Sequence, residues 1–197
     1  IGVSYAQALA LSHAIKTRDI VSSDKYKRLF PEFALKKDQS AKTDFRNEVG
    51  GQRFTTSTGG TVTGMHAHQI LIDDPLNPQQ AVSSVERISA NEFVSTTLSS
   101  RKIDKEMTPT ILIMQRLHED DPTGHLLGKQ GKDIKHICLP AEDSDNVKPK
   151  ELREKYVDGL LDPIRLNRSA LNDALVDLGS YAYAGQFDQD PAPREGG

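Results

Sequence analysis

Two adjacent carboxylates, Asp73 and Asp74, follow the apolar run Ile-Leu-Ile at residues 70–72 and precede Pro75. Such a run is typical of a strand covered on both faces, and proline ends the strand because it has no amide hydrogen to donate. A buried strand carries charges only at its exposed end, where they meet water, a cation or a substrate phosphate. Asp73 could hold Mg²⁺ through its water shell, and Asp74 could orient or deprotonate an attacking water. The alternative is that both aspartates only begin a turn.

Two further blocks flank the acids. The stretch Gly59-Gly60-Thr61-Val62-Thr63-Gly64 lies upstream, and Met114-Gln115-Arg116 follows the next apolar run at residues 111–113. In this order, the blocks resemble the ATPase domain of the large subunit of tailed-phage DNA-packaging terminases, and the resemblance covers nearly the whole chain. Its other parts are Val3-Ser4-Tyr5, residues 23–31, Thr123-Gly124-His125-Leu126-Leu127, Leu139-Pro140-Ala141, residues 178–187 and residues 191–197.

The resemblance implies a role for each motif. In the family, the strand that ends in paired acids is the Walker B element, so Asp73 is expected to coordinate magnesium and Asp74 to be the catalytic carboxylate. Gln115 and Arg116 occupy the segment that senses the γ-phosphate, where they could hydrogen-bond the phosphate and stabilise transition-state charge. The expected nucleotide-binding residues also include Gly59, Gly60 and Gly64. For Arg116, the alternative is a salt bridge to the acids at residues 119–121.

The resemblance also implies cofactors and partners for the intact protein. The cofactors are ATP and Mg²⁺, and the activity is ATP hydrolysis coupled to pumping double-stranded viral DNA into a procapsid. The expected partners are the portal protein, the small terminase subunit and further copies in a homo-oligomeric ring. The expected location is the cytoplasm of the bacterial host, transiently on the procapsid.

The sequence departs from the family at two places. No glycine-rich loop ends in Gly-Lys-Ser or Gly-Lys-Thr, and the nearest string is Gly128-Lys129-Gln130. We therefore expect the chain to begin after the phosphate loop and to hydrolyse ATP poorly or not at all by itself. Relatives commonly have Thr-Gly-Arg-Gly-Ala-Asp where this chain has Thr63-Gly64-Met65-His66-Ala67-His68. Met65 cannot replace that arginine at a neighbouring subunit's phosphate, and the histidines could do so only when protonated.

Two hypotheses from other classes stay open. His66 and His68, with Asp73 and Asp74 close behind, have the residue types of a metal-dependent hydrolase. Against this, five extended residues from His68 to Asp73 span about 16 Å, too far for one metal, which favours an exposed or capping role for both histidines. The second hypothesis is a non-catalytic scaffold or prophage remnant.

Composition restricts the function classes. The 197 residues can bury one core, or one core with a small appendage, and the net charge of −3 gives no bulk attraction to nucleic acid. Any DNA contact must come from local basic residues such as Lys25, Lys27, Arg28, Lys36, Lys37 and Lys42. The single Cys138 is predicted to be a small buried residue of a strand at residues 134–139, in a reducing compartment. We find no signal peptide and no apolar run of membrane-spanning length.

Periodicity predicts alternating strands and helices. We expect strands at residues 1–5, at residues 70–72 and after Pro109. We expect helices at residues 6–20, about 79–101, 166–178 and 181–186, and a surface helix within residues 148–155. A hairpin should join residues 43–49 to residues 53–58 through a turn at Gly50-Gly51. Asp121 should cap a short helix that has Pro122 at its first position.

The predicted fold is α/β, a RecA-like P-loop NTPase-type sheet that is mainly parallel and flanked by helices, N-terminally truncated, with a helical C-terminal appendage. We expect residues 1–142 to form the ATPase core and residues 143–187 a charged loop with a helical subdomain. Residues 188–197 should start a linker to an absent RNase H-like nuclease, so no DNA cleavage is expected.

Overall fold

The computed structural model describes residues 1–129 and 134–191, apart from the side chains of Gln39 and Ser40. These residues form two compact units. Unit 1 comprises residues 1–77 and 88–114, and unit 2 comprises residues 78–87 together with the described residues from 115 onward. The predicted domain boundaries at residues 142 and 187 stay predictions.

The described part of unit 1 contains a six-stranded mixed sheet with the order β2-β3-β4-β1-β5-β6. Four neighbouring strands are parallel: β4 (Gln52–Ser57), β1 (Gly2–Ser4), β5 (Ile70–Asp73) and β6 (Thr110–Ile113). At one margin, β2 (Leu35–Ser40) and β3 (Asp44–Asn47) add antiparallel pairs. The α/β prediction is therefore confirmed, while the sheet is mixed and contains a strand, β2, that was not predicted.

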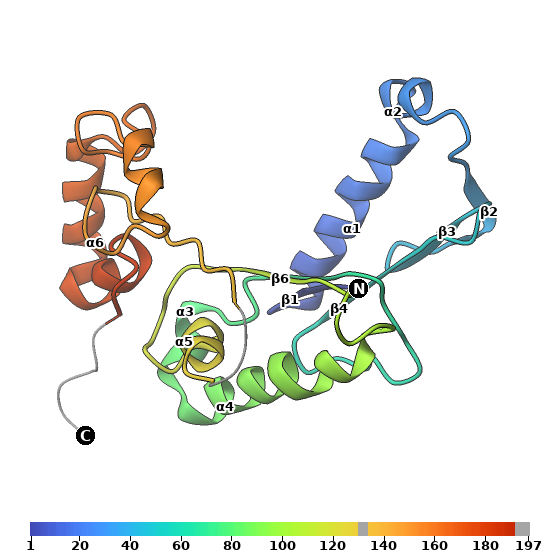
Figure 1. Ribbon diagram of the computed structural model, residues 1–197, viewed down its shortest axis with the longest axis horizontal. Helices are drawn as coiled ribbons and strands as arrows, with labels where there is room; N and C mark the ends of the chain where they lie inside the picture. The colour runs from blue at the N-terminus through green and yellow to red at the C-terminus, as the bar shows by residue number, and fades with distance from the viewer. Residues whose placement is uncertain (130–133, 192–197) are drawn as a thin grey trace. The chain divides into compact units, whose positions relative to one another are not determined.

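Helix α1 (Gln7–Ser22) covers β1 and β4 and confirms the helix predicted at residues 6–20. Its buried Ala10 and Ala14 lie on one stripe because they are one helical turn apart. Helix α2 (Asp24–Leu29) follows at once, with Ser23 Oγ accepting a hydrogen bond of 3.2 Å from the Tyr26 amide. Figure 1 shows α1 running from β1 to α2, after which the chain returns to β2 and β3.

The predicted hairpin is present as β3 and β4 with an antiparallel register. Gly50 has a φ of 89°, a backbone conformation that glycine adopts without steric cost. At Gly51 the amide donates to Asn47 Oδ1 at 2.6 Å, and a Cβ there would lie 2.8 Å from the side-chain nitrogen Nδ2 of Asn47. The positive φ therefore favours glycine at Gly50, whereas a side chain at Gly51 would displace the Asn47 side chain.

The strands β5 and β6 are less buried than the sequence predicted. In β5, Ile70 and Ile72 are completely buried, but Leu71 is only half-buried, so the strand is not covered on both faces. The strand after Pro109 was predicted to be buried, and this is wrong: in β6, Ile111 is 41% exposed and Ile113 is 56% exposed. The reason is position, since β6 pairs only with β5 among the described residues and forms that margin of the sheet.

The helix predicted at residues 79–101 is interrupted. It comprises α3 (Pro78–Val82), α4 (Ser84–Glu92), the π-helical turn η1 (Phe93–Thr97) and the 3₁₀ turn η2 (Ser99–Arg101). Ser83 separates the first two, and its hydroxyl accepts a hydrogen bond of 3.4 Å from the Glu86 amide at the start of α4. Ala90, Phe93, Val94 and Leu98 are buried. The apolar periodicity therefore marked the correct segment, but it did not reveal the internal cap at Ser83.

Unit 2 contains α5 (Pro122–Leu127), the 3₁₀ helix η3 (Lys150–Lys155) and α6 (Arg168–Gln186). Gly179, with a φ of 75°, divides α6 close to where two separate helices were predicted. The core of unit 2 consists of the buried residues Ala141, Leu160, Leu171 and Tyr183. Phe187 stacks on Tyr183 with ring centroids 4.9 Å apart.

The strand predicted at residues 134–139 is wrong. Only Cys138 pairs, in an isolated antiparallel bridge with Lys148. An apolar run becomes a strand when a neighbour supplies hydrogen bonds along its length, and here the pairing stops after one residue. The prediction that Cys138 is buried is confirmed, and burial raises the pKa of its thiol.

Across residues 1–129 and 134–191, no helix combines the length and the apolar character needed to cross a lipid bilayer.

Candidate functional site

The paired acids lie at the carboxyl end of an interior parallel strand. Asp73 is the last residue of β5, which lies between β1 and β6 with both neighbours parallel to it. Ser4 of β1 pairs with Ser57 of β4, so these strands end at the same edge of the sheet. The structure therefore has Asp73 and Asp74 at the edge where the sequence predicted them.

Backbone hydrogen bonds join the three strand ends. The Tyr5 amide donates to the Asp74 carbonyl oxygen at 2.8 Å, and the Thr58 amide donates to the Ser4 carbonyl oxygen at 2.8 Å. The Thr58 hydroxyl also donates to the Pro75 carbonyl oxygen at 2.8 Å. The loops after β1, β4 and β5 are thus fixed to one another, which holds the backbone under the two acids in place.

Asp74 has a left-handed backbone conformation, with a φ of 46°. Aspartate tolerates this region better than most residues, yet such positions carry a strain cost and concentrate at functional sites. The Asp74 amide still donates to the Ile113 carbonyl oxygen at 2.9 Å, so the turn begins immediately after the ladder. The two half-buried aspartates therefore differ in backbone conformation: Asp73 is extended as the last residue of β5, and Asp74 is left-handed.

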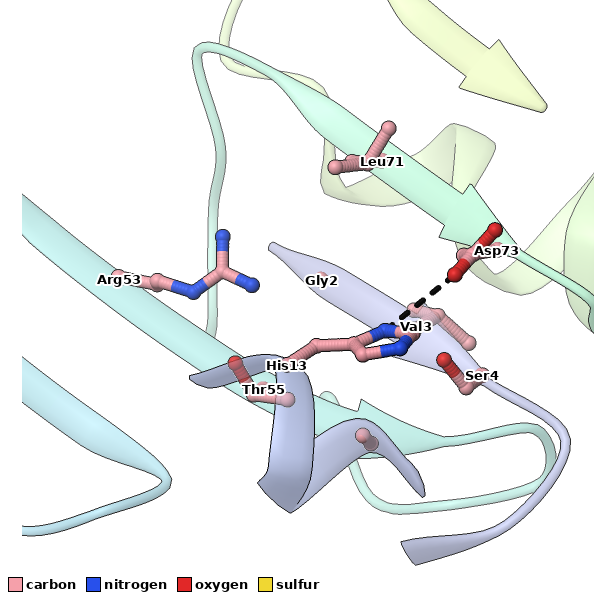
Figure 2. Close-up of a pocket in the computed structure, with 9 residues that line it drawn as sticks. Gly2, Val3, Ser4, His13, Arg53, Thr55, Leu71 and Asp73 are labelled. Atoms are coloured by element: carbon pink, nitrogen blue, oxygen red, sulfur yellow. Dashed lines mark ion pairs between the residues drawn. The ribbon is translucent and has the colours of Figure 1, made fainter. Parts of the chain in front are cut away.

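Asp73 contacts a histidine side chain that the sequence analysis did not connect with it. Its Oδ2 lies 3.3 Å from Nδ1 of His13, a residue of α1, as Figure 2 shows. The two side chains are 36% and 30% exposed respectively, so the pair is partly screened by water. The helical periodicity of α1 could have indicated this contact, because His13 lies beside Ala10 and Ala14 on the face of α1 that packs on the sheet. His13 restrains one oxygen of the Asp73 carboxylate.

The first two predicted glycines lie in the loop after β4, at the same edge of the sheet. Gly59 has a φ of 76°, and a Cβ on Gly60 would collide with the Thr56 side chain and lie 2.8 Å from the Ser57 carbonyl oxygen. The positive φ explains Gly59, and close approach to Thr56 and Ser57 explains Gly60. Their predicted part in nucleotide binding stays a prediction.

The third glycine, Gly64, has a φ of 78° and belongs to a separate turn. The Met65 amide closes that turn on the Val62 carbonyl oxygen at 3.1 Å, and the Val62 side chain is buried. Gly64 is thus explained by the turn geometry that anchors Val62.

Gln115 and Arg116 belong to unit 2. Arg116 Nε donates to both carboxylate oxygens of Asp121, at 3.1 and 2.9 Å, and Asp121 is completely buried. The same carboxylate accepts from the amides of Leu117 at 2.9 Å and Gly124 at 2.8 Å, the second being the predicted cap of α5. The ion pair foreseen as the alternative for Arg116 is confirmed, and its action on a phosphate stays a prediction.

The residues of the metal-hydrolase alternative lie on opposite sides of β5. His66 and His68 are exposed, as predicted for an exposed or capping role, and they precede β5 whereas Asp73 and Asp74 follow it. Within the described ranges, no three His, Cys, Asp or Glu side chains gather closely enough to hold a metal ion. The described residues therefore give no support to a four-residue zinc or manganese site, and the metal-dependent hydrolase stays an untested alternative.

Several of the basic residues considered for DNA contact lie on one short segment. Lys25, Lys27 and Arg28 are exposed on α2. Beside them, the ring centroid of Tyr26 lies 4.7 Å from that of Phe30 and 5.2 Å from that of Phe33. A positive surface with adjacent aromatic rings is compatible with nucleic acid, although charged residues of this kind usually only solvate a surface.

No protein-family model matches this chain, and no curated protein sequence matches it.

Proposed function

We propose that this chain is part of the ATPase domain of a DNA-packaging terminase large subunit, whose intact form couples ATP hydrolysis to translocation of double-stranded DNA into a procapsid. One observation carries the proposal: two consecutive carboxylates end β5 between two parallel neighbours. Ligands of open α/β sheets bind outside the carboxyl ends of the strands, at this kind of edge. A RecA-like identity of the sheet is part of the same proposal.

The residues present fit a magnesium ion. Mg²⁺ prefers hard oxygen ligands, keeps several of its waters and is commonly held through one or two carboxylates together with substrate phosphates. Asp73 offers a carboxylate that is 36% exposed at the sheet edge, and no cage of several protein ligands is needed. Mg²⁺ bound there would neutralise developing charge on a phosphate. His13 acts as a positioning residue, because its contact at 3.3 Å restrains the Asp73 carboxylate.

Asp74 is the proposed catalytic carboxylate. It follows Asp73 directly, and its left-handed φ of 46° gives it a backbone geometry that differs from that of the strand. A carboxylate in this position orients an attacking water and accepts its proton. Since aspartate is one methylene shorter than the glutamate found in other branches of the family, the water must lie closer or act through a second water.

The printed sequence offers no Gly-Lys-Ser or Gly-Lys-Thr cradle for the triphosphate. Without the backbone amides and lysine of such a loop, the phosphate charge is uncompensated, so the 197-residue chain is proposed to be inactive alone. The double-stranded DNA, the portal protein, the small subunit and the ring of further copies are partners of the intact protein in this proposal.

Two measurements test the proposal. The first is the sequence encoded immediately before Ile1, where a Gly-Lys-Ser or Gly-Lys-Thr loop is expected; an encoded protein without one contradicts the motor. The second is Mg²⁺-dependent ATP hydrolysis by the full-length encoded protein. Asp73→Ala should abolish turnover, whereas Asp38→Asn, an exposed carboxylate on β2 of the same unit, should leave it unchanged. Equal turnover in both variants contradicts the assignment, and a full-length protein that binds portal without hydrolysing ATP favours a scaffold.

A further inference from the structure

A small cavity with a mixed apolar and polar lining lies beneath α1, on the sheet face formed by β1, β4 and β5. Its lining includes Gly2, Ser4, His13, Arg53, Thr55 and Leu71, and it has room of about 20 Å³ for a water-sized group. A site needs roughly 10–15 Å³ by this measure to hold one water. Figure 2 shows the Arg53 side chain extending from β4 toward Gly2 of the neighbouring strand.

Gly2 creates the space. Register pairing sets Gly2 beside Thr55 on one side and Leu71 on the other, so a side chain on Gly2 would occupy the cavity. A Cβ there would lie 3.3 Å from Arg53 Nη2 and 3.5 Å from Thr55 Oγ1. The cavity is therefore bounded by polar atoms at distances suited to a single hydrogen-bonded group.

Two buried polar atoms of this lining have no hydrogen-bond partner among the described residues: Thr55 Oγ1 and Arg53 Nε. Thr55 is only 3% exposed, so bulk water does not satisfy its hydroxyl. Leaving a buried donor unsatisfied costs about 1–3 kcal/mol, and more for a charged group, so nearly all such groups in native proteins have a partner. The unpaired atoms thus indicate a bound group that accepts hydrogen bonds.

The charge of the lining indicates the sign of that group. Arg53 is a cation with donors only, and none of the ion pairs among the described residues involves it. Its surroundings are poorly solvated, which lowers the pKa of its guanidinium. The one carboxylate of the lining, Asp73, contacts His13 Nδ1 at 3.3 Å. A water could satisfy Thr55, whereas an anion would also give the partly buried guanidinium a counter-charge.

We propose that this cavity is an anion site, which takes a chloride ion or a single oxygen of a small oxyanion such as formate or phosphate. The bound atom accepts hydrogen bonds from Arg53 Nε and from the Thr55 hydroxyl. The donors of this site come from β4 and it needs no nucleotide, although its lining also includes Asp73 and His13 of the proposed magnesium site. It would stabilise the packing of α1 on the sheet whenever the anion is present.

The test is an NMR titration of the isotope-labelled 197-residue chain. Chloride, formate and phosphate each replace a bulky sulfonate at constant ionic strength, while the Arg53 Nε–Hε and Thr55 amide signals are followed. A saturable shift of both signals supports the site. Saturation by chloride alone identifies a halide site, and saturation by formate or phosphate identifies an oxyanion site. Absence of a saturable shift with all three anions overturns the proposal.

Variants locate the binding. Thr55→Val keeps the shape and the Arg53 charge but removes the hydroxyl, and it should weaken binding about tenfold, as expected for a lost hydrogen bond to a charged group. Gly2→Ala should weaken it by filling the space. The matched control is Arg46→Gln, because Arg46 is an exposed arginine on the adjacent strand β3. A loss in Arg46→Gln as large as in Thr55→Val would mean non-specific surface binding and would overturn the proposal.

Discussion

Replacing Arg116 with methionine should destabilise unit 2 strongly, whatever Arg116 does for a nucleotide. The substitution keeps much of the apolar stem but removes the only cation that contacts Asp121 among the described residues. Asp121 is completely buried, so its carboxylate would lose its counter-charge in a poorly solvated position.

The magnitude follows from the contacts that remain. Breaking a buried pair by removing one partner costs about 3–5 kcal/mol. Asp121 would retain the amide donors of Leu117 at 2.9 Å and Gly124 at 2.8 Å, which places the cost near the lower limit, at about 3 kcal/mol. That value corresponds to roughly a hundredfold shift in the unfolding equilibrium.

The assay is urea denaturation followed by NMR signals of the Leu117 and Gly124 amides, which donate to the Asp121 carboxylate. Arg153→Met is the matched control, because Arg153 pairs with Asp143 at 2.7 Å but is 42% exposed. Exposed pairs contribute about 0–1 kcal/mol, so this variant should lose little. Equal losses of stability in Arg116→Met and Arg153→Met would refute the reasoning that the buried pair is structural.

Three further outcomes are expected. The 197-residue chain should show no ATP turnover above its Asp73→Ala/Asp74→Ala variant in a phosphate-release assay, and a clear excess would contradict the need for a phosphate loop. Gly60→Ala should lower the unfolding free energy in urea by about 1–3 kcal/mol, because its Cβ would lie 2.8 Å from the Ser57 carbonyl oxygen; an unchanged midpoint contradicts that close approach. Burial raises the pKa of Tyr156 to about 12, so the neutral phenol contributes stability below pH 10 that is lost between pH 10 and 12. An absorbance titration compared with that of Tyr156→Phe checks this expectation. Ionisation of Tyr156 near pH 10 would contradict it.

The features that sequence predicted correctly have local causes. The acids at the end of β5 were predictable because an aliphatic run followed by Asp-Asp-Pro leaves the charges no other place than the strand end. The cap of α5 was predictable because Asp121 and Pro122 occupy the positions that helix starts prefer. Both predictions depend on residues that are close in sequence.

The features that sequence missed depend on partners far along the chain. His13 and Asp73 are 60 residues apart, and the helical stripe of α1 indicates a packed face without showing what it meets. Strand β2 has a polar, Lys-rich sequence and forms because β3 pairs with it. Residues 134–139 do not form the predicted strand for the opposite reason, since only Cys138 pairs with another segment. Pairing between distant segments decides each of these cases.

The most direct test of the central claim is ATP binding and turnover by the full-length encoded protein carrying Asp74→Asn. Removing only the negative charge of the proposed catalytic carboxylate should lower turnover at least about a hundredfold while nucleotide affinity stays within a few fold, because a general base acts on the chemical step. Unchanged turnover in Asp74→Asn would contradict the account that the paired acids at the end of β5 serve a nucleotide.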